Sequence, residues 1–126
     1  AYLLAIAVQF FAPGIPQVYY VGLLAGKNDL KLLEETKVGR NINRHYYTKE
    51  EIDAEVKRPV VAELLRMMEF RNAHPAFDGT FELENSDDDK LVIVRRNGDA
   101  WAKLSADFKA KKFEITYTED GEVRAF

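Results

Sequence analysis

Residues 1–26 read AYLLAIAVQFFAPGIPQVYYVGLLAG, and this uncharged stretch decides how the chain folds. A helix of that length would be long enough to cross a bilayer. The Pro-Gly pair at 13–14 and Pro16 interrupt it, however, and leave two pieces that are each too short to span. We therefore expect no membrane span. The sequence predicts a buried helix over residues 2–11, a tight turn, and a buried strand over residues 15–21.

So much apolar sequence is unusual in a chain of 126 residues. Helices and strands of a domain of this size normally bury one face and expose the other. An opening segment that is apolar on all sides needs a larger body to pack into. We therefore expect the chain to be the C-terminal end of a longer protein. A buried helix followed by a buried strand is one step of an α/β alternation.

The composition excludes several function classes. Lys and Arg number 18 against 21 Asp and Glu, so the net charge of −3 predicts no general attraction to nucleic acid or to anionic membranes. The sequence has no cysteine and only His45 and His74, which argues against thiolate chemistry, disulfides and a multi-histidine metal site. The aspartates at 87–89 lack the calcium-loop pattern and predict a solvated turn. We expect neither a metal nor a cofactor.

A polar segment at 39–47 is the part best suited to binding a ligand, and a brief helix is predicted before it at 30–36. Arg40 and Arg44 lie four residues apart in it, surrounded by Asn41, Asn43 and His45. Arginine and asparagine offer planar donors that suit the vicinal hydroxyls of a sugar or a carboxylate, and the tyrosines at 46–47 can pack beside a sugar ring. Alternatively, the arginines pair with acidic residues of a neighbouring element. The residues alone leave both interpretations open.

The remaining sequence predicts helices followed by a small sheet. Residues 48–51 form a capping box at the start of a short helix, and Pro59 opens a longer helix with one apolar face. We expect His74 to cap the C-terminal end of that longer helix. Towards the C-terminus, alternating apolar residues and the turn dipeptides at 97–98 and 120–121 predict about five antiparallel strands with one buried face.

Long motifs between residues 10 and 81 carry a family resemblance. They are FFAPGIPQVYYVGLLAGKND at 10–29, GRNINRHYY at 39–47, RPVV at 58–61, FRN at 70–72 and AFDGTF at 76–81. Together they closely resemble the C-terminal third of bacterial sucrose phosphorylases, which belong to the α-amylase superfamily (glycoside hydrolase family 13).

The resemblance implies an α+β fragment. It consists of the last helix–strand–helix of a (β/α)8 barrel, followed by a small antiparallel β-sheet domain. Residues 1–78 would then be the C-terminal end of the catalytic barrel, and residues 79–126 the β domain. The segment that carries Arg40 would follow the last barrel strand, on the face where barrel enzymes have their active sites.

The resemblance also implies an activity for the longer protein. Family members convert sucrose and phosphate to α-glucose 1-phosphate and fructose by a retaining double displacement, with an Asp nucleophile and a Glu acid/base. These carboxylates would precede this chain, so no catalytic residue is assigned to it and it is expected to be inactive alone. Arg40 resembles the family arginine that contacts glucose hydroxyls. Many members have Asp where this chain has Asn41, which leaves the orientation of Arg40 and the identity of the acceptor open.

Two alternatives stand beside this interpretation. The same scaffold occurs in phosphorylases that act on sucrose 6-phosphate or glucosylglycerate. The β domain could also be a non-catalytic interaction module, although Trp101 is the only tryptophan of the sequence. For the longer protein we expect sucrose and phosphate as partners, no nucleic acid, no membrane, and a cytoplasmic location. The isolated chain is expected to associate with itself.

Overall fold

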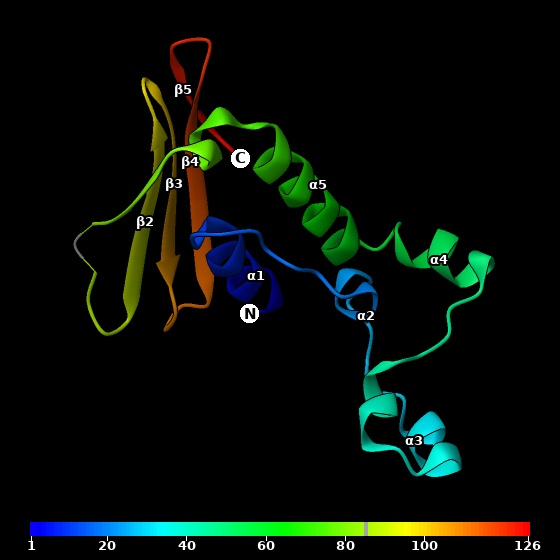
Figure 1. Cartoon of the computed structure of the whole chain (residues 1–126). Coiled ribbons are helices and arrows are strands. Elements are labelled where there is room, and N and C mark those ends of the chain that lie inside the picture. The colour runs from blue at the N-terminus through cyan, green and yellow to red at the C-terminus, as the bar shows by residue number, and fades with distance from the viewer. Residues whose placement is uncertain (85) are drawn as a thin grey trace. The chain divides into compact units, whose positions relative to one another are not determined.

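The computed structural model describes residues 1–84 and 86–126, and it consists of helices and one five-stranded sheet (Figure 1). The α-helices are α1 (Tyr2–Phe11), α2 (Tyr20–Leu23), α3 (Leu30–Thr36), α4 (Lys49–Glu55) and α5 (Pro59–Ala73). The 3-10 helices are η1 (Gly39–Asn43) and η2 (Pro75–Asp78). The strands are β1 (Thr80–Leu83), β2 (Lys90–Asn97), β3 (Ala100–Asp107), β4 (Lys112–Glu119) and β5 (Glu122–Ala125). Among the described residues, no helix is both long and apolar enough to span a bilayer.

The sheet is an antiparallel meander in which every strand pairs with its neighbours in sequence. Asn97 pairs with Ala100 across the β2–β3 turn, where Gly98 has a φ of 58°. Asp120 and Gly121 form the β4–β5 turn with φ values of 53° and 80°. Tight hairpin turns require such left-handed backbone angles, which glycine and aspartate tolerate. The predicted antiparallel sheet is therefore confirmed.

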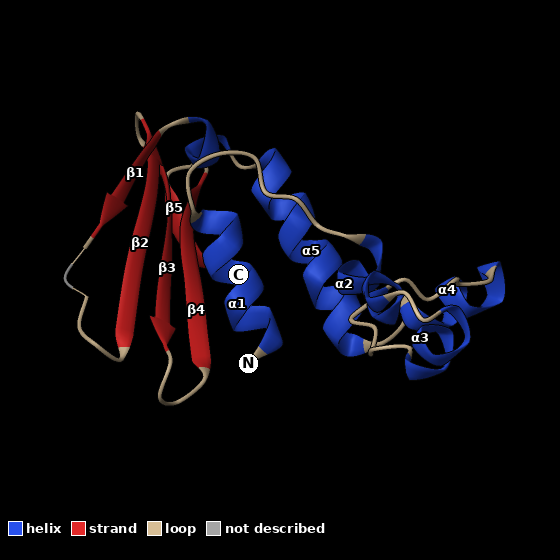
Figure 2. Ribbon diagram, turned by 60° about the horizontal axis from the view of Figure 1, so that its bottom comes forward, coloured by secondary structure: helices blue, strands red, loops and turns tan. Residues whose placement is uncertain are grey.

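One face of the sheet carries the core of this part of the molecule. On β3, Ala102, Leu104 and Ala106 are buried, whereas the residues between them are half-buried. On the opposite face, Lys103 pairs with Glu84 at 2.5 Å. The helix α1 contacts β2 and β3 and lies beside the sheet in Figure 2. Its buried residues recur at helical spacing and are Leu4, Ala7, Phe10 and Phe11.

The end of α1 is fixed by an arginine from the end of α5. Arg71 donates from Nε to the carbonyl oxygen of Phe10 at 3.0 Å and from Nη2 to that of Gly14 at 3.2 Å. Its guanidinium carbon lies 4.6 Å from the centre of the Phe77 ring. The negative end of a helix dipole and an aromatic face both attract a guanidinium. The helix predicted over residues 2–11 is thus present and anchored at its C-terminal end.

The predicted strand over residues 15–21 does not form, so that prediction is wrong. Residues 15–19 have no regular structure, and α2 begins at Tyr20. Tyr19 has strand-like backbone angles, with φ −76° and ψ 144°. A strand needs a hydrogen-bonded neighbour, and none of the five described strands pairs with this segment. Ile15 is accordingly 94% exposed.

The helical predictions are confirmed, with one correction. The brief helix at 30–36 is α3, and α5 begins at Pro59. Thr48 and Glu51 form the predicted capping box of α4. His74, however, does not cap α5 with its side chain. Its Nδ1 accepts a hydrogen bond from the backbone N–H of Ala76 and caps η2 instead.

The described residues form two compact units. The first contains residues 1–16 and 67–126, and the second contains residues 17–66. The proposed division into a barrel end at 1–78 and a β domain at 79–126 refers to a longer protein, and it stays a prediction.

Candidate functional site

The predicted ligand-binding segment folds into η1, which displays Arg40. The side chain of Arg40 is exposed. Within the described ranges of the chain it has no hydrogen-bond or ion-pair partner. The alternative in which Arg40 pairs with an acidic neighbour therefore finds no partner among these residues. The guanidinium is left with its full set of planar donors for a ligand.

Asn41, next to Arg40, turns towards α3. Its Nδ2 donates to Oγ1 of Thr36 at 3.0 Å, and Oγ1 of Thr36 donates to the carbonyl oxygen of Leu32 at 2.7 Å. Because the Thr36 hydroxyl proton is already used, its oxygen can only accept here. It accepts from Asn41 and from the backbone N–H of Val38 at 3.4 Å, and an aspartate at position 41 could not donate to it. The asparagine is therefore a tether between η1 and α3.

Asp29 anchors η1 from its other side. Its backbone N–H donates to the carbonyl oxygen of Ile42 at 2.6 Å. Its carboxylate caps α3, because Oδ1 accepts the N–H of Leu32 at 2.9 Å. One residue thus fixes both the beginning of α3 and the backbone of η1. Sequence reasoning did not single out Asp29.

His45 lies between two carboxylates. Its Nδ1 is 2.8 Å from Oδ2 of Asp29, and its Nε2 is 3.4 Å from Oε1 of Glu51. Glu51 also accepts the backbone N–H of Thr48 at 2.6 Å through its other oxygen. Both carboxylates therefore serve a helix N-terminus and the histidine at once.

These contacts shift the pKa values in opposite directions. The hydrogen bond to Asp29 is the main cause that raises the pKa of His45. The N–H of Leu32, and after it His45, lowers the pKa of Asp29. The N–H of Thr48, and after it His45, lowers the pKa of Glu51. All three shifts favour a charged triad.

The two tyrosines of the segment have different environments. Tyr47 packs against the His45 ring, with ring centres 4.6 Å apart, and against Tyr20 at 6.1 Å. Burial raises the pKa of its hydroxyl. Tyr46 is 77% exposed and borders an apolar hollow of about 400 Å³. Of the two, Tyr46 is exposed and Tyr47 is half-buried.

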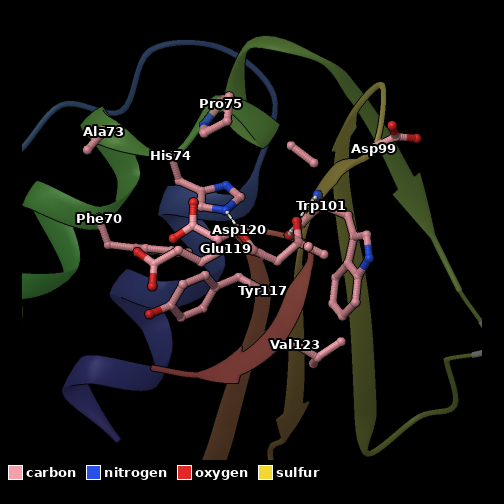
Figure 3. A pocket seen from close by; sticks show the side chains of 13 residues that line it. Phe70, Ala73, His74, Pro75, Asp99, Trp101, Tyr117, Glu119, Asp120 and Val123 are labelled. Atoms are coloured by element: carbon pink, nitrogen blue, oxygen red, sulfur yellow. Dashed lines mark hydrogen bonds between the residues drawn. The ribbon is translucent and has the colours of Figure 1, made fainter.

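A separate pocket of about 740 Å³ lies where α5 meets the two hairpin turns (Figure 3). Figure 3 shows Trp101 on one side and His74 on the other, with the Tyr117 ring below His74. The Nε2 of His74 donates to the carbonyl oxygen of Thr118 at 2.7 Å, while its Nδ1 accepts from Ala76. Both imidazole nitrogens are therefore used structurally.

Aromatic and acidic side chains give this pocket its character. Glu119 and Asp120 line it together with Asp99, whose carboxylate points away from His74 (Figure 3). No lysine or arginine is among the described lining residues. Sequence reasoning identified both turns but not their convergence, since that depends on how the strands register.

No group of three or more His, Asp or Glu residues in the described ranges could hold a metal ion.

Comparisons with known proteins point to one group of enzymes. No protein-family model matches the chain. The chain is 52% identical to a glucosylglycerol phosphorylase of Marinobacter adhaerens and 52% identical to a sucrose phosphorylase of Streptococcus mutans. These alignments cover 98% and 99% of this chain, but 26% of each relative.

A solved structure gives the same result. The crystal structure of sucrose 6F-phosphate phosphorylase from Thermoanaerobacter thermosaccharolyticum matches with a TM-score of 0.96 and 46% sequence identity. The match covers 99% of this chain and 26% of that one. The chain thus spans about a quarter of the length of the relatives it matches.

Proposed function

We propose that this chain, which is homologous to the C-terminal segment of sucrose phosphorylases and related glycoside phosphorylases, supplies a substrate-binding arginine to such an enzyme. The reaction of the complete protein is the transfer of a glucosyl group from sucrose to phosphate, which yields α-glucose 1-phosphate and fructose with retention. The residues described here end the (β/α)8 barrel and form the sheet domain behind it. The catalytic carboxylates belong to the preceding part of the protein. We propose a cytoplasmic location for the complete protein.

The observation that carries this proposal is the free guanidinium of Arg40. It lies on a short turn that is tied by Asp29 and Asn41 to the elements around it. A planar, always charged group on a fixed backbone is suited to donating to two neighbouring sugar hydroxyls. Arg40 therefore binds the glucosyl group and takes no part in bond making, since it neither gives up a proton nor attacks carbon.

The group to which glucose is joined in the donor substrate, which is the acceptor in the reverse reaction, is less narrowly specified than the glucosyl group. Relatives named for sucrose and for glucosylglycerol are equally identical to this chain, at 52% each. Identity over this segment therefore supports a shared glucosyl site and does not separate the acceptors. Sucrose is our first choice of donor; sucrose 6-phosphate, glucosylglycerate and glucosylglycerol are the alternatives.

Substitution of Arg40 in the full-length protein tests the proposal. A charged donor to a sugar hydroxyl contributes about 1.5–3 kcal/mol, so Arg40→Ala should lower kcat/KM for phosphate-dependent sucrose cleavage by about one to two decades. Arg40→Lys should restore part of the loss, since it keeps the charge and loses the planar fork.

Arg124→Ala is the matched control, because it removes an exposed arginine from β5, where Arg124 pairs with Glu119. Its kcat/KM should equal that of the unmodified protein. If Arg40→Ala also keeps full kcat/KM with every candidate donor, Arg40 is a structural loop residue and the proposal is wrong.

A further inference from the structure

The imidazole of His45 joins the caps of two helices. Asp29 caps α3 and Glu51 completes the capping box of α4, and each presents its second carboxylate oxygen to a ring nitrogen of His45. Neither carboxylate is fully buried: the side chains of Asp29 and Glu51 are 21% and 46% exposed. The histidine is thus the connection between two otherwise separate helix N-termini.

This geometry calls for a particular protonation state. A neutral imidazole has one N–H donor and one acceptor nitrogen. With carboxylate oxygens at both nitrogens, the neutral ring would turn its acceptor towards an oxygen that carries negative charge. Only the imidazolium can donate in both directions.

The remaining groups around His45 do not compete for its ring nitrogens. The Tyr47 ring packs edge-on against the imidazole, and the Tyr20 hydroxyl, from α2, donates to the backbone carbonyl oxygen of His45 at 3.0 Å. Among the described residues, the ionisable side chains within hydrogen-bond distance of the imidazole nitrogens are Asp29 and Glu51. Lys27 and Lys31 line the hollow beside His45.

The contacts of His45 with Asp29 and Glu51 enclose the segment that contains η1, and we call them the bracket. Asp29 donates its backbone N–H to the carbonyl oxygen of Ile42, three residues before His45. Asp29 and His45 thus close the segment that contains η1, and Arg40 lies inside it. Opening the Asp29–His45 contact would leave the η1 segment with the Ile42 bond and the Asn41–Thr36 tether.

We propose that His45 is a positioning residue for Arg40: as an imidazolium it ties the caps of α3 and α4 together and thereby keeps η1 in the geometry that presents Arg40 to the glucosyl group. The role of Arg40 in this statement rests on the function proposed above. The bracket itself is a property of the described residues.

The pH dependence has a definite sign. Because the pKa of His45 is raised, its contribution is complete below the ordinary histidine pKa of about 6.5 and is lost as the pH rises through the raised value. The pKa values of Asp29 and Glu51 are lowered, so their contribution is complete above about pH 4.5 and is lost in acid. The contacts of the bracket are therefore formed from mildly acidic pH up to the raised pKa of His45.

Hydrogen exchange of the full-length protein tests the bracket without reference to activity. The amides of residues 37–47 should be protected at about pH 5.5 and lose protection, after correction for intrinsic rates, by about pH 9. His45→Gln should show low protection across this range. His74→Gln is the matched control, since His74 contacts only Thr118 and Ala76 through its ring nitrogens, and it should behave as the unmodified protein.

Kinetics test the consequence for Arg40. At acidic pH, His45→Gln should raise KM for the glucosyl donor by about two- to fivefold, the equilibrium equivalent of an exposed ion pair, and leave kcat unchanged. The two proteins should converge as the pH rises. Glu51→Gln, which preserves the capping box, should give a smaller effect in the same direction.

The outcomes separate the two proposals. If Arg40→Ala has no effect on sucrose cleavage while the pH-dependent protection is present, the proposed function fails and the bracket stands. If Arg40→Ala is impaired but His45→Gln matches the unmodified protein in protection and in KM at every pH, the role of His45 is wrong.

Discussion

The guanidinium of Arg95 donates a hydrogen bond to the carbonyl oxygen of Phe11, which lies 84 residues earlier in the chain. Arg95 is only 5% exposed, and burial lowers its pKa. Its five N–H donors all face backbone carbonyl oxygens, which belong to Phe11, Ala12, Phe77, Gly79 and Thr80. Arginine has five such donors. Among the described residues no carboxylate is within ion-pair distance of Arg95, so the main chain of two segments, residues 11–12 and 77–80, satisfies this buried cation.

Replacing Arg95 should destabilise the packing of α1 on the sheet. Arg95→Met leaves several buried carbonyl groups without a donor, so we expect the free energy of unfolding to fall by about 2–4 kcal/mol. Urea unfolding followed by Trp101 fluorescence, at concentrations where the chain is monomeric, measures this. Arg124→Met, at an exposed site, should cost far less. Equal stability of the two variants would contradict the assigned role of Arg95.

Gly79 is required where the chain enters the sheet. A Cβ atom there would collide with the carbonyl oxygen of Arg96 and lie 2.8 Å from the Cα atom of Asn97, both in the backbone of β2. Backbone atoms cannot rotate away, so Gly79→Ala should cost about 1–3 kcal/mol. Gly39→Ala is the control, because nothing lies within 4 Å of its added Cβ. Similar melting temperatures for the two variants would overturn this expectation.

The isolated 126-residue chain should not cleave sucrose, with or without phosphate. Retaining transfer requires a nucleophile and an acid/base carboxyl about 5–5.5 Å apart. The family resemblance places both in the part of the protein that precedes this chain. Release of fructose above the level of a heat-treated control would show that the chain carries its own catalytic pair.

The isolated chain should also associate with itself. Although α1 is covered by the sheet, Ile15 is 94% exposed and Tyr19 is 48% exposed, beside backbone without strand partners. Exposed apolar residues and unpaired extended backbone both favour contact with a second copy. Sedimentation at micromolar concentration should show dimers or larger species, and Ile15→Ser should reduce them. A monomer over the whole concentration range is the contrary result.

Local signals in the sequence were sufficient for most of the secondary structure. The Pro-Gly pair at 13–14 ends α1, Thr48 and Glu51 start α4, and the dipeptides at 97–98 and 120–121 turn the hairpins. Each signal acts within about four residues, where backbone sterics and capping bonds decide the outcome. The strand expected at 15–21 failed because strand formation depends on a partner, which residue type cannot reveal.

The candidate site was less accessible to sequence reasoning. The motif at 39–47 singled out Arg40, but the contact of His45 with Asp29 joins residues 16 apart in a region without periodicity. The bond between His74 and Thr118 joins residues 44 apart. Such pairs depend on tertiary packing, so a pattern within one segment cannot predict them. One signal was available: a histidine lies in the sequence between two helix caps that each contain a carboxylate. It predicts a contact only after both caps have been located.

The Arg95–Phe11 bond also has a consequence for biosynthesis. A ribosome adds about 5–20 residues per second, so α1 waits roughly 4–17 seconds after its own completion before Arg95 exists. During that interval Leu4, Phe10 and Phe11 have no sheet to cover them. The strands, by contrast, pair only with their neighbours in sequence and can assemble as they emerge. The sheet residues therefore complete the burial of α1, and a chain whose translation stops before β2 leaves α1 uncovered for chaperones and proteases.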